Sequence, residues 1–168
     1  MHDAALLMNL FKLLAEGKLD MAKFLQMLTR AVVQEAAASR VGVWFYQGDL
    51  KDSLLCNSLY DAGDGQWSSG SVLSEDEYQD YFDTIRETKL VVAADARNYH
   101  ATACFNEGYF DLLNIYSRLD VVIEVDGHPM GVVSCEQTGQ AREWSQQDLQ
   151  FMQQAAATVG LALKKFGG

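Results

Sequence analysis

Proline, cysteine and long apolar runs are scarce in this chain. Proline occurs once among the 168 residues, at Pro129, so no proline-rich linker divides the sequence. The three cysteines, Cys56, Cys104 and Cys135, are odd in number and widely spaced. This argues against a disulfide framework and against a metal site built on closely spaced cysteines. No apolar run reaches the roughly 18 residues that a membrane-spanning helix requires.

Positive charge is also scarce. The chain has 23 acidic and 13 basic residues, which gives a formal net charge of -10. Such a balance repels phosphate backbones and anionic lipids, so we expect neither nucleic acid nor a membrane surface as a partner. The amino terminus carries His2 and Asp3 and lacks the basic segment of a signal peptide. We therefore expect a cytoplasmic protein.

Helical spacing of apolar residues predicts three long helices, two at the start of the chain and one at its end. The first is expected over residues 3–17 and the second over 20–38, with Asp20 as its N-cap. Ser145 and Asp148 resemble a capping box at the start of the last helix. A two-heptad apolar seam along that helix suits either core packing or pairing in a dimer. The seam consists of Leu149, Met152, Ala156, Val159 and Leu163.

Apolar, β-branched and aromatic runs predict strands at about 40–47, 51–61, 90–92, 118–125 and 129–137. Asp126-Gly127 is a hairpin turn between the last two strands. We expect a loop at 61–70, a helix that begins at Ser74 and a short helix at 107–114. Consecutive hairpins imply an antiparallel sheet, so the fold class is α+β. The terminal helices should cover one face of the sheet and the middle helices the other.

Three short segments have a recognisable family character: Gly131-Val-Val-Ser-Cys-Glu136 followed by Arg142-Glu-Trp144-Ser145, Val41-Gly-Val-Trp-Phe, and Val92-Ala-Ala-Asp95-Ala96-Arg97. With the order of the elements, they make residues 20–165 resemble a GAF domain. This sensor fold has a PAS-like antiparallel sheet, and the resemblance is to GAF domains joined to diguanylate cyclases and sensor histidine kinases. It implies one domain over 1–168, with an N-terminal helix at 1–19 and a GAF core at 20–165 that includes a signalling helix. It further implies a homodimer through the terminal helices and an output domain such as GGDEF or a histidine kinase.

The resemblance also implies a ligand pocket between the sheet and the middle helices. Asp95 and Arg97 are candidates to orient a polar end of the ligand, or else to form a surface ion pair or a turn cap. Val133 and Cys135 share one strand face, which we expect to be the pocket face. Six aromatic residues either line the pocket or pack the helices on the sheet. They are Tyr78, Tyr81, Phe82, Phe105, Tyr109 and Phe110.

The family does not imply a particular ligand, because GAF domains bind cyclic nucleotides, bilins, haem, small acids or nothing known. The cyclic-nucleotide signature cannot be placed here, and the segment 106–113 lacks the cysteine that would attach a bilin. The cofactor is therefore unknown, and we expect a bacterial regulatory domain that catalyses no reaction and either senses an unidentified small molecule or only mediates dimerisation. The alternative is a thiol enzyme of the free methionine-sulfoxide reductase type. Cys104 follows His100 by four residues, but a second cysteine at the family's spacing is missing.

Overall fold

The structure is a computed structural model that describes residues 2–167. Its helical elements are α1 (Ala5–Ala15), α2 (Met21–Ala36), α3 (Gln79–Thr88), the 3-10 turn η1 (Ala103–Phe105), the irregular turn η2 (Asn106–Phe110), α4 (Asp111–Leu113) and α5 (Gln146–Phe166). Its strands are β1 (Arg40–Tyr46), β2 (Ser53–Asp61), β3 (Gln66–Ser68), β4 (Val72–Ser74), β5 (Leu90–Ala93), β6 (Ile115–Val125) and β7 (His128–Thr138).

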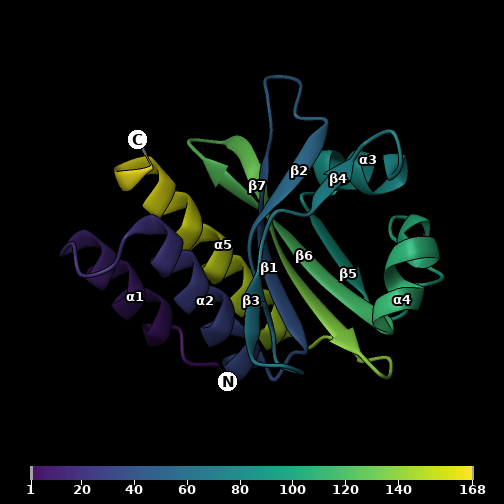
Figure 1. Ribbon diagram of the computed structural model, residues 1–168, viewed down its shortest axis with the longest axis horizontal. Helices are drawn as coiled ribbons and strands as arrows, with labels where there is room; N and C mark the ends of the chain where they lie inside the picture. The colour runs from purple at the N-terminus through teal and green to yellow at the C-terminus, as the bar shows by residue number, and fades with distance from the viewer. Residues whose placement is uncertain (1, 168) are drawn as a thin grey trace.

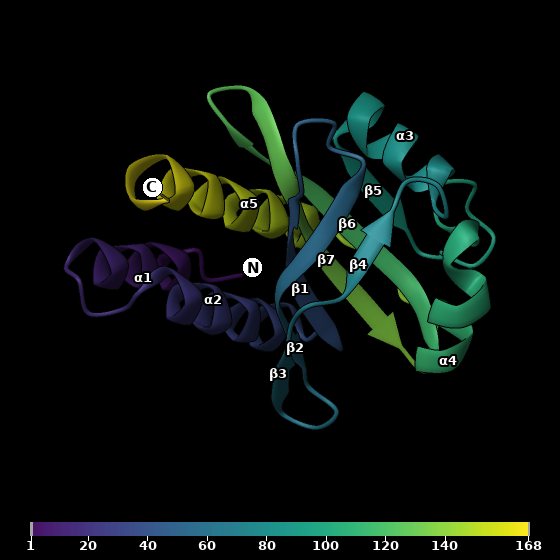
Figure 2. The ribbon, with the colours of Figure 1, turned by 45° about the horizontal axis from the view of Figure 1, so that its top comes forward.

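Within the described residues, the seven strands form one antiparallel sheet in the order β3-β2-β1-β7-β6-β5, and β4 pairs with β2 outside this path. Helices α1, α2 and α5 lie on one face of the sheet, and α3 and α4 lie on the other (Figures 1 and 2). This arrangement confirms the predicted α+β architecture. None of the helices in residues 2–167 combines the length and the apolar content that a membrane span requires.

The terminal helices and the sheet enclose the first of two hydrophobic cores, which we call the helix-side core. Of the heptad seam of α5, Met152, Ala156 and Val159 are buried in it, and the two outer leucines pack against it. The seam therefore packs in the core of its own chain and is not free to pair with a second copy. Helix α5 also comes very close to the sheet at Gly160, where an added Cβ would lie 2.4 Å from the carbonyl oxygen of Glu124.

The predicted start signals of the terminal helices are confirmed. The Asp20 carboxylate accepts a hydrogen bond from the backbone N–H of Lys23 at 2.8 Å, as an N-cap should. Ser145 and Asp148 form a reciprocal capping box, in which each side chain accepts from the other residue's backbone N–H. The hairpin turn at Asp126 and Gly127 is also present, with both residues at positive φ.

Two predictions for the middle of the chain are wrong. Ser74 does not open a helix but ends β4, and α3 begins five residues later at Gln79. The acidic residues after Ser74 form a turn, in which the Glu75 carboxylate pairs with Arg86 of α3. The predicted loop at 61–70 contains β3, whose pairing with β2 extends the sheet edge. These short segments carry too few apolar residues for their period to be read.

Candidate ligand-binding site

A row of alternating charges crosses four neighbouring strands on the sheet face that points away from the terminal helices. Arg118 of β6 is opposite Glu136 of β7, Glu136 is opposite Arg40 of β1, and Arg40 is opposite Asp61 of β2. We call these four residues the charge ladder. Their side chains are 0%, 1%, 12% and 38% exposed in that order. The ladder therefore runs from the interior of the domain to its surface.

The inner end of the ladder is a network of ionic hydrogen bonds in which one buried donor, Nη2 of Arg118, has no partner among the described residues. The Nε atom of Arg118 donates to both carboxylate oxygens of Asp120 at 3.0 and 2.9 Å, and its Nη1 atom donates to Glu136 at 3.1 Å. The Tyr81 hydroxyl donates to Asp120, and the Tyr109 hydroxyl donates to Glu136 at 2.6 Å. These contacts compensate for the removal of one cation and two carboxylates from water.

Three aromatic rings surround the Arg118 guanidinium. Its central carbon lies 4.9 Å from the ring centroid of Phe105, 5.3 Å from that of Tyr81 and 5.6 Å from that of Tyr109. Burial by itself lowers the pKa of Arg118, but Asp120, the two tyrosines and Glu136 together hold that pKa well above its usual value. The side chain is therefore a permanent cation that fills the space between the sheet, α3 and η2.

Burial has the opposite effect on the acidic partner. It raises the pKa of Asp120 above its ordinary value, and the neighbouring Arg118 only partly offsets this change. Burial likewise raises the pKa of Tyr81 and of Tyr109, so both hydroxyls remain protonated donors. The network thus has fixed donor and acceptor roles near neutral pH.

A cleft of about 230 Å³ opens at the Arg40 end of the ladder. Strands β1, β2 and β4 form its floor, and η2 and α4 form one wall. Its lining residues are Arg40, Trp44, Cys56, Leu59, Ser68, Ser71, Val72, Leu73, Tyr78, Gly108, Tyr109 and Leu113. The lining is thus mainly apolar and aromatic, with several hydroxyls and one guanidinium, a composition typical of small-molecule sites.

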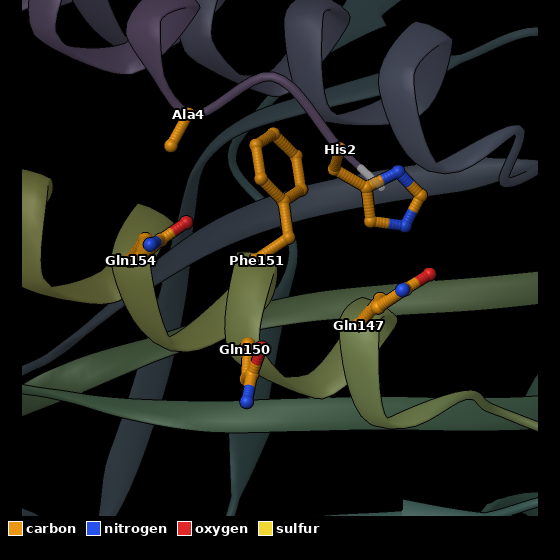
Figure 3. A pocket seen from close by; sticks show the side chains of 6 residues that line it. All are labelled: His2, Ala4, Gln147, Gln150, Phe151 and Gln154. Atoms are coloured by element: carbon orange, nitrogen blue, oxygen red, sulfur yellow. The ribbon is translucent and has the colours of Figure 1, made fainter.

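A second hollow, of about 270 Å³, lies on the other side of the molecule, where the residues before α1 cross α5. Figure 3 shows three glutamine side chains of α5 at its edge, near the rings of His2 and Phe151. The His2 Nε2 atom lies 2.7 Å from Asp148 Oδ1, and the two rings pack 5.2 Å apart. These contacts anchor the start of the chain to α5, and the hollow is the space left beside that anchor.

The three thiols occupy different environments. Cys56 lies in the cleft, and burial raises the pKa of its thiol to about 11. Burial also raises the pKa of Cys104 and, more strongly, that of Cys135. Cys135 packs in the helix-side core, on the opposite face of the sheet from Cys56. At neutral pH all three are protonated thiols, whereas a nucleophilic cysteine must be a thiolate.

The sheet carries the terminal helices on one face and the cleft on the other. A comparison of sequences identifies the family to which such a fold belongs. The family model of the GAF domain matches residues 20–163 of the chain. The chain belongs to the GAF domain family. Among curated proteins, none matches its sequence.

Solved structures of other GAF domains share the fold. The phycocyanobilin-bound GAF domain from a cyanobacterial phytochrome has a TM-score of 0.80 at 13% identity, over 98% of this chain and 96% of that one. The GAF domain from Acinetobacter phosphoenolpyruvate-protein phosphotransferase has a TM-score of 0.72 at 13% identity, over 95% and 90% of the two chains. The A. aeolicus nlh2 GAF domain in an inactive state has a TM-score of 0.68 at 14% identity, over 95% and 94%.

The predicted aromatic residues of this GAF domain divide into two groups. Tyr78 and Tyr109 line the cleft. The other four are fully buried in the core beneath it and have no surface that faces the cleft: Tyr81, Phe82, Phe105 and Phe110. Two of the six aromatic residues therefore line the cleft, and the other four pack the helices on the sheet.

Asp95 and Arg97 lie outside the cleft lining and make local contacts. The Asp95 carboxylate accepts a hydrogen bond from the Asn98 amide at 2.9 Å, as a turn cap does. The Arg97 guanidinium donates to the carbonyl oxygen of Ile115 at 2.8 Å and lies 4.1 Å from the ring centroid of Tyr116. Arg97 therefore fixes the start of β6.

The expected orientation of Val133 and Cys135 is wrong, because both residues pack in the helix-side core. Their neighbours Ser134 and Glu136 point to the cleft face. Both faces of β7 are buried, so apolar character alone could not indicate which face holds the ligand site.

The sequence reasoning missed the charge ladder and Asp120. Arg118 and Asp120 lie in the buried part of β6 and alternate with Leu119 and Val121, which pack in the helix-side core. Charged residues at every second position of a buried strand are a signal for an internal ionic network, because unpaired charges are not tolerated there. That signal was present in the sequence.

Proposed function

We propose that this GAF domain is a regulatory module that binds a small molecule in the cleft and catalyses no reaction. The observation that carries the proposal is the cleft itself. It combines an arginine, several hydroxyls and an apolar wall on the sheet face opposite the terminal helices. The raised pKa values of the three thiols disfavour the alternative, an enzyme of the free methionine-sulfoxide reductase type.

The remaining parts of the proposal follow from the family and from the outer helices. We propose a bacterial cytoplasmic signalling protein in which this domain forms a homodimer and is joined to an output domain such as GGDEF or a histidine kinase. The exposed side of α5 carries Gln147, Gln150, Gln154, Ala157 and Leu161. This uncharged stripe supports self-association, since most of the surface of a chain with net charge -10 repels a second copy.

The size of the cleft limits the ligand. Pockets for drug-sized molecules have volumes of roughly 300–1,000 Å³, and the cleft is smaller. A bilin like the one in the phytochrome relative is a large tetrapyrrole and would require the cleft to open. We therefore propose a ligand well below the size of a bilin.

A second candidate function has an observation in its favour. The Arg118 side chain and its aromatic neighbours already fill the interior beside the sheet. This supports a domain that only mediates dimerisation and binds no ligand.

A thermal-shift and NMR screen of nucleotides, amino acids, organic acids, bilins and haem separates the two candidates. Ser71 lines the cleft and is exposed, so Ser71→Trp should block the cleft without disturbing the core. Ser69 is exposed outside the lining, which makes Ser69→Trp a matched control. If the domain is a sensor, at least one compound should raise the Tm of the parent and of Ser69→Trp but not that of Ser71→Trp. The absence of any stabilising compound would favour the dimerisation role.

A further inference from the structure

We infer that the ligand of the cleft is a small organic monocarboxylate with an apolar or aromatic body, whose carboxylate is bound by Arg40. The inference rests on the proposed function, because it names the chemical class of ligand for the same cleft. Its starting point is the outer end of the charge ladder, where the hydrogen bonding of Arg40 is incomplete.

Arg40 has hydrogen-bonding capacity that the described residues do not use. Its Nη1 atom donates to Glu136 Oε1 at 2.9 Å. Its Nε atom is buried and has no hydrogen-bond partner among the described residues, since the nearest carboxylate oxygen, Oδ2 of Asp61, is 3.4 Å away and poorly aligned. A guanidinium presents five N–H donors in a planar fork that matches a carboxylate. The Nε atom has almost no solvent-accessible surface, so an incoming carboxylate would pair with the Nη2 donors, which make no hydrogen bond to a described residue.

The cleft offers no comparable binding partner for a cationic ligand. Among its described lining residues, Arg40 is the sole charged side chain, and none is acidic. Both ladder carboxylates beside Arg40 are already engaged. Glu136 accepts from Arg40, Arg118 and Tyr109, and Asp61 forms an ion pair with Arg40 and accepts from the backbone N–H of Gly63. An amine would thus meet a guanidinium without a free carboxylate to compensate it, which makes a cationic ligand unfavourable.

The rest of the lining fits an apolar body. Trp44, Leu59 and Leu73 belong to the buried core under the cleft, and Leu113 is a half-exposed leucine at its rim. The volume of about 230 Å³ equals that of roughly eight water molecules at their liquid density. A single ring or a short branched chain with one carboxylate matches this space, and a dinucleotide does not.

The test measures binding by ¹H–¹⁵N NMR titration of the whole chain with benzoate, phenylacetate and 3-phenylpropionate. Each acid is paired with its amide and with an amine of the same body, and phenylphosphonate tests a doubly charged anion. We expect at least one acid to shift signals of the cleft residues, and to bind at least about tenfold more tightly than its amide and its amine.

Two variants locate the site. Arg40→Gln should weaken binding of the acid by at least about tenfold, whereas Arg30→Gln, which changes an arginine on α2 beside Trp67, should leave it unchanged. Because Arg40→Gln also removes a partner of Glu136, it could disturb folding. Ser71→Trp then serves as the second variant, since it blocks the cleft from an exposed position and leaves the ladder intact, with Ser69→Trp as its control.

The possible failures are distinguishable. If an amide or an amine binds in the cleft as tightly as the acid, the inference that the ligand is a carboxylate is refuted. The proposal that the cleft binds a small molecule is then retained. Preference for the phosphonate over every carboxylate would also overturn the inference of a carboxylate. Acid binding that persists in Ser71→Trp would place the site elsewhere and refute the inference. If none of these compounds binds at millimolar concentration, the inference fails, and the wider screen described above then decides whether the sensing role also fails.

Discussion

Replacement of Arg118 by methionine should severely destabilise the domain. Methionine is unbranched and apolar, so it fills much of the same space, and the main loss is electrostatic. The change leaves Asp120 and Glu136 buried without their shared cation. Removal of one partner from a buried ion pair costs about 3–5 kcal/mol. This is a large part of the roughly 5–15 kcal/mol by which a domain is stable.

The expected change in thermal stability follows from the size of the chain. For domains of 150–250 residues, 1 kcal/mol corresponds to a shift of about 2–4 °C in Tm, so we expect Tm to fall by about 6–20 °C. The free energy of unfolding should be measured in urea, with circular dichroism and tryptophan fluorescence as independent probes. Adding Asp120→Asn and Glu136→Gln to the variant should restore at least half of the loss, because neutral amides are cheaper to bury than carboxylates.

The pH dependence provides a second check with a definite sign. Burial already raises the pKa of Asp120 in the folded state, and among the neighbours that lower this pKa the charge of Arg118 has the largest effect. Without Arg118 the folded-state pKa rises further above the unfolded value. Between these two values the folded state binds more protons than the unfolded state, so stability falls as pH rises through that window. The variant should therefore recover stability relative to the parent as the pH is lowered from 7 to 5.

Two results would refute this reasoning. One is a loss of less than about 1 kcal/mol at pH 7, which would mean that water or a structural rearrangement solvates the two carboxylates. The other is a difference between variant and parent that does not change between pH 7 and pH 5. Either result would show that Arg118 is not essential to the buried network.

Three further predictions concern other contacts. Tyr109→Phe removes the hydroxyl that donates to Glu136 at 2.6 Å, and urea unfolding should show a loss of about 1.5–3 kcal/mol; a change under 0.5 kcal/mol would contradict that role. Gly160→Ala places a methyl group 2.4 Å from the carbonyl oxygen of Glu124, so the same assay should show a loss of about 1–3 kcal/mol, whereas unchanged or increased stability would show that α5 can move aside. Ala157→Glu adds a charge to the exposed stripe of α5, and light scattering should show the proposed dimer dissociating into folded monomers; a dimer that persists would exclude this stripe as the interface.

The terminal helices and the main hairpin could be predicted because their signals are local. The Asp20 cap, the Ser145–Asp148 capping box and the Asp126-Gly127 turn each involve residues a few positions apart, and all of them occur as expected. Long amphipathic helices also repeat their apolar pattern several times. Such signals do not depend on the rest of the fold.

The site was harder to predict because it depends on strand register. Arg40, Asp61, Arg118 and Glu136 are dispersed over 97 sequence positions, from 40 to 136, and only the pairing of four strands puts them in one row. The sheet is buried on both faces, so alternation of apolar residues does not indicate which face holds the cleft. For this reason Val133 and Cys135 were assigned to the wrong side.

The cleft and the terminal helices are linked by a short segment of chain. Arg40 begins β1 four residues after Ala36, the last residue of α2. At this helix end Arg142 donates to the carbonyl oxygens of Ala36 at 2.7 Å and Ala37 at 3.0 Å. The same guanidinium lies 3.3 Å from Asp148 at the start of α5. If occupancy of the cleft acts on the helices through this link, ligand binding should be coupled to Arg142. A double-mutant cycle with Arg40→Gln and Arg142→Met, read out as the free energy of ligand binding from NMR titrations, tests this coupling. Additivity within about 0.5 kcal/mol would show that the two arginines act independently.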